Sequence, residues 1–568
     1  MSKVIERTPW KILDEYRGKK FNGLWPTLPE LFDITVSRFG ERPCFTIYEP
    51  DRISLNYQEA MAKIKAVARY LHGKGIRKGD AIAVTGKNSP EWAVAYLGVL
   101  FAGAIVVPID YQLKNEETDL LLRTSKAKIL FVDEEKYKRY DENKNAESIA
   151  LREVISLKKN VGAYIYDLDG EEADIERAVE TDIAAILFTS GTTGVPKGVI
   201  LSHQNLTSDC FLAQGYLELY PTDVFYALLP IHHAYTMLAV FIETISTGAE
   251  LVFGKKMVTQ VILKDLKQAK ITMLLGVPML FNKVIAGILR GLKAKGVVVY
   301  AVISFLMEIS GLIKKIFKVN PGKKMFGFVL KKASLTTLRI CICGGGPLAP
   351  SVFRKYNQLG LDFIQGYGLT ETSPIITLNP VEHYKETSVG KVLPQVDMKV
   401  LDPDERGAGE IVVKGPVVMQ GYFELPEETK ASFTEDGYLK TGDMGYLDEE
   451  NYLYLTGRAK NLIVTEGGKN VYPEEIENEF QLFEEIEQIL VRGFVLDKKM
   501  KTEGIEALVF PNAEVFKDVQ ADTVKARVNA LVSEVNQRLQ PYQKIARVTI
   551  LAERMEETTT KKIKRDAV

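Results

Sequence analysis

The chain has 568 residues, 46% of them hydrophobic and 26% charged, and its formal net charge is −1. This length exceeds what one hydrophobic core usually supports, so we expect at least two domains. The balanced charge excludes a strongly basic nucleic-acid-binding protein, and no nucleic acid is expected as a partner. The first residues lack the apolar run of a secretory signal, and four cysteines are too few for a disulfide scaffold. We therefore expect an intracellular globular protein with buried thiols.

The N-terminal half alternates apolar runs with helical patterns. Between residues 81 and 108, an apolar run, a helix body at 92–101 and a second apolar run follow one another. Pro90 is placed in the first helical turn and Gly103 ends the helix. A similar succession leads into the apolar run 128–132. This half is predicted to be an α/β domain with a largely parallel sheet.

A polar loop joins two apolar, β-type runs at 183–188 and 199–201. Glycines in such a loop let backbone N–H groups approach phosphate oxygens, hydroxyls add donors, and a lysine supplies positive charge. It is not a Walker A loop, because no Gly-Lys-Ser/Thr follows a four-residue gap and no helix opens at the lysine. The alternative is a flexible surface turn rich in Ser, Thr and Gly. The residues with this phosphate-binding chemistry are Thr189, Ser190, Gly191, Thr192, Thr193, Gly194 and Lys197.

Two segments that contain glycines follow further along the chain. Residues 339–343 are predicted to form a strand that runs into a glycine triplet, which lets a flat ligand approach the backbone; the alternative is a mere tight turn. Residues 363–372 place Tyr367 between two glycines, where its ring can stack on a purine. Glu371, four residues later, can hold Mg²⁺ on phosphate oxygens. Both segments thus offer groups that fit a nucleotide.

These stretches, in this order, resemble the motifs of the adenylate-forming superfamily, which includes acyl-CoA synthetases, luciferases and the adenylation domains of peptide synthetases. The resemblance covers about residues 31–565 and is greatest to the long-chain fatty acid:CoA ligases. It implies that Tyr367 stacks on adenine, Thr370 binds the α-phosphate and Glu371 ligates the metal. The nucleotide-binding residues that it adds to the loop above are Gly344, Gly345, Gly346, Gln365, Gly366 and Gly368.

Residues 228–235 contain two adjacent histidines. A metal site is disfavoured there, because neighbours in a strand point to opposite faces and no third ligand is nearby. The segment instead resembles the family's Pro-Leu-Phe-His element, with His233 at the histidine position. This resemblance implies that the pocket for the carboxylate substrate is bordered by His233, Ala234, Tyr235 and Gly276.

The C-terminal third carries the remaining motifs. Short alternating runs between about residues 390 and 457 predict a small β-rich subdomain. The resemblance assigns Asp443 to the ribose hydroxyls, Arg458 to ribose or phosphate, Lys460 to the hinge, Gly467 and Gly468 to the path of CoA, and Lys562 to catalysis together with Lys197, Thr370 and Glu371.

The fold prediction is an α/β protein in two parts. Residues 1–457 are expected to form a large N-terminal adenylate-forming domain of two α/β subdomains and the β-rich subdomain. Residues 458–568 are expected to form a small, mobile α+β lid domain. In it, apolar positions from Val524 to Leu539 predict an amphipathic helix, and residues 547–551 predict a strand.

Residues 285–332 depart from the pattern of an ordinary soluble enzyme. Their apolar run, 296–307, is interrupted by Glu308, so a membrane-spanning helix of about 20 apolar residues is not expected. Lysines are dense on both sides of the run. Two interpretations stay open: a buried core helix with solvated lysines, or a helix that lies in the membrane interface on anionic headgroups. The density of lysine favours the second.

The function implied by the resemblance is ATP-dependent activation of a carboxylic acid, a long-chain fatty acid, to acyl-AMP and pyrophosphate, followed by transfer to CoA. ATP, Mg²⁺ and CoA are the implied cofactors. The alternatives are an acyl-AMP ligase that loads a carrier-protein phosphopantetheine, and a non-catalytic nucleotide-binding or membrane-scaffold protein that kept the fold. The expected location is the cytoplasm, with attachment to the cytoplasmic face of a membrane left open. The sequence carries no signal for an oligomeric state.

Overall fold

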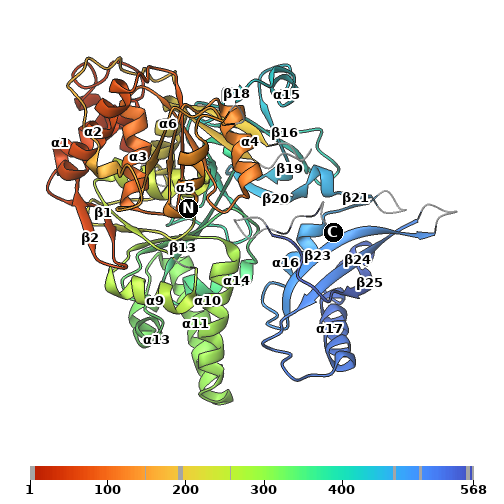
Figure 1. Cartoon of the computed structure of the whole chain (residues 1–568). Coiled ribbons are helices and arrows are strands. Elements are labelled where there is room, and N and C mark those ends of the chain that lie inside the picture. The colour runs from red at the N-terminus through yellow and green to blue at the C-terminus, as the bar shows by residue number, and fades with distance from the viewer. Residues whose placement is uncertain are drawn as a thin grey trace.

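The computed structural model describes residues 7–146, 149–189, 196–255, 257–464, 469–497, 502–557, 563 and 565. Within these ranges the strands form sheets of thirteen, seven, three and two strands. The two largest sheets and their helices make up the body of the molecule, and the three-stranded sheet lies beside it (Figure 1). This arrangement agrees with the predicted α/β class.

The seven-stranded sheet has the order β18-β8-β7-β4-β3-β5-β6. Strands β7, β4, β3, β5 and β6 are parallel, whereas β8 pairs antiparallel with β7. Helix α3 (Pro90–Phe101) joins β3 to β4 and begins where the Ser89 hydroxyl accepts a hydrogen bond from the Trp92 N–H (3.1 Å). The predicted strand–helix–strand unit is therefore confirmed. The strands are β3 (Ala81–Thr85), β4 (Ile105–Ile109), β5 (Ile129–Val132), β6 (Glu153–Ser156), β7 (Ile183–Thr189), β8 (Lys197–Ser202) and β18 (Gly421–Tyr422).

The thirteen-stranded sheet has the order β16-β17-β19-β20-β15-β14-β13-β12-β11-β9-β10-β1-β2. It is parallel from β13 to β1 and antiparallel from β16 to β13. Its antiparallel half contains the strands of the segment predicted to be β-rich. The strands are β1 (Pro43–Ile47), β2 (Ile53–Asn56), β9 (Val224–Ala227), β10 (Glu250–Phe253), β11 (Met273–Gly276), β12 (Ile340–Cys343), β13 (Asp362–Gly368), β14 (Ile375–Leu378), β15 (Gly390–Val392), β16 (Asp397–Leu401), β17 (Gly409–Lys414), β19 (Leu439–Leu447) and β20 (Tyr452–Arg458).

One hydrophobic core runs between the two large sheets. Helices α3 and α6 (His203–Ala213) contact strands of both sheets, and nearly every residue of α6 is buried. Further helices of this part are α1 (Leu28–Phe39), α2 (Tyr57–Gly73), α4 (Asn115–Ser125), α5 (Glu134–Asn143), α7 (Ala234–Thr236), the π-helix η3 (Met237–Ile242), α8 (Glu243–Thr247), α9 (Thr259–Gln268), α12 (Gly322–Met325), α13 (Gly327–Lys332) and α15 (Pro426–Ala431).

The C-terminal sheet has a core of its own. Strands β23 (Ile486–Asp497), β24 (Thr502–Pro511) and β25 (Ile545–Ile550) pack with α16 (Pro473–Asn478) and α17 (Ala521–Asn536). The predicted amphipathic helix and strand are thus found as α17 and β25. This part contacts the large part through Gln481, which donates a hydrogen bond to the Pro347 carbonyl (3.0 Å) and accepts one from the Ala349 N–H (2.8 Å).

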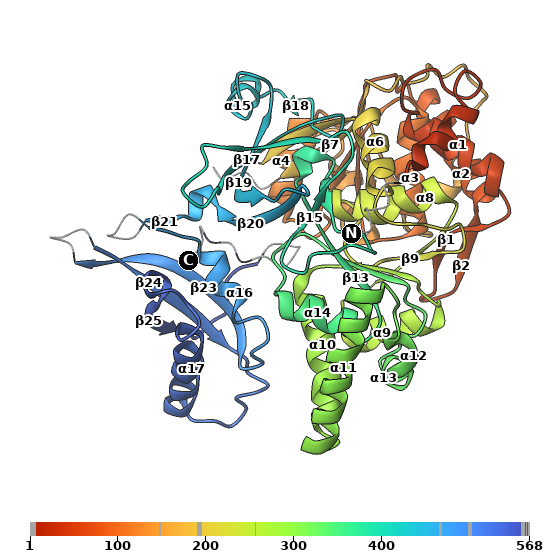
Figure 2. The same cartoon turned by 180° about the vertical axis from the view of Figure 1, so that it is seen from behind.

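Helices α10 (Pro278–Lys293) and α11 (Val297–Phe317) lie side by side and extend away from the sheets (Figure 2). Glu308 interrupts the apolar run but not the helix, and both interpretations left open by the sequence are helical, in agreement with α11. Glu308 accepts a hydrogen bond from Gln358 Nε2 (2.7 Å), so its charge is accommodated against α14 (Pro350–Gln358). Within the described residues, α11 is the one helix whose length and composition would allow it to cross a membrane.

One face of α11 is nevertheless built into the domain. Ile303, Met307, Ser310 and Lys314 are its buried residues. The Lys314 ammonium donates to Asp362 Oδ1 (2.7 Å) and to Asn357 Oδ1 (2.8 Å). Because these contacts fix α11 on the large part, a spanning orientation would break them.

The ion pair of Lys314 predicts a stability effect. Lys314→Met should leave the partly buried Asp362 without its cation and destabilise the domain by about 2 kcal/mol. A fall of several degrees in the calorimetric melting temperature is expected. The exposed neighbour gives the matched control, since Lys315→Met should leave melting almost unchanged. Equal melting of both variants would contradict this account.

Candidate active site

The predicted phosphate loop connects β7 and β8. Thr189 and Lys197 are paired across these strands, at the two ends of the loop. Ser190, Gly191, Thr192, Thr193 and Gly194 lie outside the described residues. Lys197 begins β8, and its Nζ lies 5.0 Å from the centre of the Tyr422 ring, a cation–π contact.

Tyr422 connects this lysine to the predicted metal ligand. Its hydroxyl donates a hydrogen bond to Glu371 Oε1 (2.9 Å), and the Met419 N–H donates to the Glu371 carbonyl (2.9 Å). Burial and the neighbouring Glu371 carboxylate raise the pKa of Tyr422, so it remains a hydrogen-bond donor. Lys197 and Glu371 are therefore brought to the same place. The role of Tyr422 was not predicted from the sequence, because this tyrosine lies in a strand of only two residues, β18.

A second group forms around Asp443. The Tyr367 hydroxyl donates to Asp443 Oδ2 (2.6 Å), and Arg458 Nε lies 3.1 Å from Asp443 Oδ1. Burial raises the pKa of Tyr367 well above its ordinary value, and the Asp443 charge adds to the rise. The structure thus joins an aromatic ring, a carboxylate and a guanidinium, which were separate motifs in the sequence.

Glycines line the space next to this group. Gly344, Gly345 and Gly346 follow β12, and Gly345 has a φ of +77°, which favours glycine. A Cβ on Gly344 would come within 3.0 Å of the Tyr235 ring, and one on Gly368 would meet the Pro374 carbonyl at 1.5 Å. The backbone is therefore packed closely here, and side chains larger than glycine do not fit.

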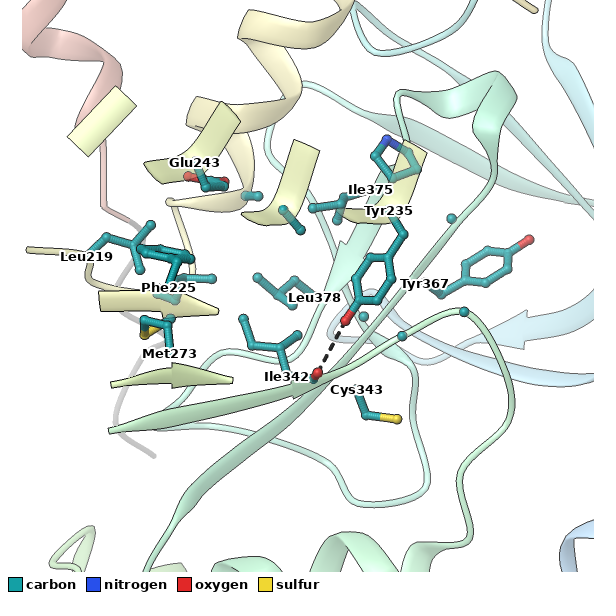
Figure 3. A pocket seen from close by; sticks show the side chains of 18 residues that line it. Leu219, Phe225, Tyr235, Glu243, Met273, Ile342, Cys343, Tyr367, Ile375 and Leu378 are labelled. Atoms are coloured by element: carbon teal, nitrogen blue, oxygen red, sulfur yellow. Dashed lines mark hydrogen bonds between the residues drawn. The ribbon is translucent and has the colours of Figure 1, made fainter. Parts of the chain in front are cut away.

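A pocket of about 630 Å³, its open mouth included, extends from these glycines into the large part (Figure 3). Its lining includes the predicted Tyr235, whose hydroxyl donates to the Ile342 carbonyl (3.2 Å) and to that of Gly276 (3.4 Å). Gly366, Tyr367 and Gly368 lie at one end, next to the Asp443 group. The remaining lining is mostly aliphatic and aromatic, which suits a hydrocarbon group.

The paired histidines have a third partner that the sequence did not reveal. Asp110, His232 and His233 offer ligand atoms that lie within 4.8 Å of one another and could hold a metal ion. The expectation that no third ligand is nearby was therefore wrong, because β4 brings Asp110 to this place from a distant part of the chain. Burial alone would raise the pKa of Asp110, but His232, 3.6 Å away, offsets this and holds it at about 2.

The other predicted site residues are placed as follows. Gln365 is buried in β13, Thr370 begins the 3₁₀ turn η4 (Thr370–Thr372), Ala234 begins α7, and Lys460 lies in the 3₁₀ turn η5 (Ala459–Asn461) directly after β20. Gly467, Gly468 and Lys562 lie outside the described residues. Among the C-terminal residues that are described, Arg565 forms two hydrogen bonds of 2.7 Å with the Glu477 carboxylate.

Comparison with known proteins identifies the family to which the chain belongs. The chain is a member of the AMP-binding enzyme family, whose pattern matches residues 32–423. Tyr367, Glu371 and Tyr422 lie within the matched residues, whereas Asp443 lies beyond their end.

Particular relatives cover nearly the whole chain. A long-chain-fatty-acid–CoA ligase of Bacillus subtilis (strain 168) is 27% identical over 561 residues, covering 91% of this chain and 90% of its own length. A feruloyl-CoA synthase of Amycolatopsis sp is 28% identical over 482 residues, covering 83% and 85%. The crystal structure of ATP-bound MatB from Rhodopseudomonas palustris has a TM-score of 0.74 at 27% identity, covering 95% of this chain and 98% of that one.

The Asp443 group predicts an effect on nucleotide binding. Asp443→Asn keeps the shape of the side chain but removes one acceptor and the charge opposite Arg458, so the Kd for AMP should rise about tenfold. Isothermal titration calorimetry measures this change. Asp397 accepts a hydrogen bond from Tyr438 in the same antiparallel region, and Asp397→Asn is the matched control. An unchanged Kd for Asp443→Asn, or an equal loss in both variants, would count against a nucleotide-binding role.

Proposed function

We propose that this protein is an acid–thiol ligase that activates a long-chain fatty acid with ATP and transfers the acyl group to CoA. The observation that carries the proposal is the convergence of three surfaces. The phosphate end consists of Lys197, Tyr422 and Glu371. The nucleoside end consists of Tyr367, Asp443 and Arg458, and the apolar pocket adjoins Tyr367.

The first half-reaction joins the acid to AMP. A carboxylate oxygen attacks the α-phosphorus of ATP, the new oxygen–phosphorus bond forms, and the bond to pyrophosphate breaks. Negative charge develops on the phosphoryl oxygens and on the leaving pyrophosphate. Lys197, at the start of a rigid strand and against the Tyr422 ring, is positioned to neutralise it. Lys562 is proposed as a second cation and Thr370 as a donor to the α-phosphate.

Glu371 fits the role of Mg²⁺ ligand. Its carboxylate accepts a hydrogen bond from Tyr422, and among the described residues no lysine, arginine or histidine forms an ion pair with it. Mg²⁺ prefers charged oxygen ligands such as this carboxylate. When bound there together with phosphate oxygens, the metal would supply positive charge to the triphosphate.

The second half-reaction forms the thioester. The CoA sulfur attacks the acyl carbon, the carbon–sulfur bond forms, the bond to the AMP oxygen breaks, and the thiol proton passes to solvent. Lys460 lies where the chain leaves β20 for the C-terminal sheet, so a rotation there is proposed to exchange Lys562 for the Gly467 and Gly468 segment. The division of the chain near residue 458 belongs to the same proposal.

The choice of a fatty acid is supported by the apolar pocket and by the Bacillus subtilis relative. The relative that acts as a feruloyl-CoA synthase marks aryl acids as the competing substrate class. Pyrophosphate release, measured over acids from acetate to long-chain fatty and aryl acids, separates these classes. Comparing CoA with a phosphopantetheine carrier protein separates the ligase from a carrier-loading enzyme. No acid-dependent release with any acid would support the non-catalytic alternative.

Replacement of the proposed catalytic lysine tests the first half-reaction. Lys562→Ala should lower acid-dependent ATP–pyrophosphate exchange by about 100-fold or more, because a well-placed charge opposite the transition state is lost. Lys561→Ala is the neighbouring control and should retain exchange. Should Lys561→Ala lose exchange while Lys562→Ala keeps it, the assignment of the catalytic position would be wrong.

We also propose that α11 binds an anionic membrane surface. The face of α11 opposite its buried residues exposes large apolar side chains, among them Val298 (77% exposed), Val302 (52%) and Phe305 (65%). Exposed Lys293, Lys295, Lys315 and Lys318 flank them. Each such cation contributes about 1 kcal/mol near anionic lipid, and the apolar face enters the interface.

The proposed location is the cytoplasmic face of a membrane. The four cysteines are buried and free of disulfides, which fits a reducing compartment. This location would place the enzyme beside a fatty acid that partitions into lipid.

A flotation assay tests the membrane face. The protein should float with vesicles that contain phosphatidylglycerol and less with pure phosphatidylcholine, and Val298→Glu with Phe305→Glu should abolish binding. Leu24→Glu with Val179→Glu changes two exposed apolar side chains elsewhere (60% and 54% exposed) and is the matched control. Unchanged flotation of the α11 variant would reject the proposal.

A further inference from the structure

A carboxyl group lies in the wall of the otherwise apolar pocket. Glu243 is the first residue of α8, directly after the π-helix η3, and is only 4% exposed. Figure 3 shows it across the pocket from Tyr367, at the end lined by Leu219, Phe225 and Met273. An acyl group joined to a nucleotide at Tyr367 would therefore extend toward Glu243.

The carboxyl has few partners inside the protein. Gln214 Nε2 donates to Glu243 Oε2 (2.7 Å), and the Cys210 thiol is a weaker partner. Among the described residues no lysine, arginine or histidine forms an ion pair with this carboxyl. A buried carboxyl without a cation is uncommon, because charged groups are rarely buried unless paired.

Its protonation state follows from this environment. Burial raises the pKa of Glu243 to about 8, although the hydrogen bonds from Gln214 and Cys210 oppose the rise. At neutral pH the group is therefore mostly a neutral carboxylic acid. A neutral acid can donate one hydrogen bond and accept others, which matches the capacity of a hydroxyl group.

The neighbouring side chains leave space in front of Glu243. Ala239 lies four residues earlier, in η3, and also lines the pocket, as does Ala213 at the end of α6. The small Ala239 and the carboxyl are thus presented to the same pocket. A ligand atom can approach the carboxyl across these alanines.

We propose that Glu243 selects acids that carry a hydroxyl group at the end remote from the carboxylate. The proposal rests on the ligase function and names the acyl class within it. A plain methyl end at this place would leave the buried carboxyl without a ligand partner, whereas a hydroxyl would exchange hydrogen bonds with it.

Matched pairs of acids test the proposal. Each n-alkanoic acid, from medium to long chain, is compared with the ω-hydroxy acid of the same length, and kcat/KM is measured by pyrophosphate release. At the length that reaches Glu243, the wild-type protein should prefer the hydroxy acid by about tenfold or more. A plain-chain preference at every length would overturn the proposal and leave the ligase function intact. No release with either member of any pair would overturn both.

Two variants locate the preference. Glu243→Met should abolish the preference for the hydroxy acid or reverse it, while Gln214 keeps Ser246 Oγ as an acceptor (2.9 Å). Met273→Leu changes the same end of the pocket without changing its polarity and should keep the preference. A hydroxy preference that survives Glu243→Met unchanged would show that another group recognises the hydroxyl. The wild-type comparison decides the question even if Glu243→Met folds poorly.

Discussion

A partly buried hydrogen bond between Tyr367 and Asp443 links the two halves of the thirteen-stranded sheet. Tyr367 lies in β13, where the parallel half ends, and Asp443 lies in β19 of the antiparallel half, four strands further along. Away from bulk water such a bond is stronger than in solvent, and the loss of one partner is costly. It fixes the plane of the tyrosine ring, keeps a carboxylate beside Arg458, and places the turn that carries Glu371 four residues later.

The phosphate end depends on another contact between distant segments. The two residues of β18 pair with β8, and this pairing inserts Tyr422 between Lys197 and Glu371. The Lys197 cation thus lies over the face of the Tyr422 ring, while the Glu371 carboxylate accepts a hydrogen bond from its hydroxyl. Tyr422 thereby brings both charged groups to the proposed phosphate end. The apolar pocket begins at Tyr367, next to these polar residues. A molecule with a charged head and a hydrocarbon tail therefore fits this arrangement.

The sequence predicted the features that depend on neighbours along the chain. Helix α3, the pair β7 and β8, and helix α17 follow from caps, periodicity and turn residues, which act over a few positions. Tyr422, Glu243 and Asp110 were missed, because each acquires its role from a segment far away in the sequence. In the sequence Glu243 looks like an ordinary residue of a helix, and only the folded structure shows that it lines a pocket. The partner of Glu308 could not be predicted for the same reason, since Gln358 belongs to α14.

Gln481 connects the C-terminal sheet to the turn that follows the glycine triplet. Its amide binds Pro347 and Ala349, one to three residues after Gly346. If ligand binding shifted this turn, the two hydrogen bonds of Gln481 would be disturbed, and by linkage a change in the attachment of the small sheet would change binding by the same factor. Such a coupling would need no long pathway, because Gln481 contacts the turn directly. One contact between the smaller and the larger part thus lies beside the proposed nucleotide site.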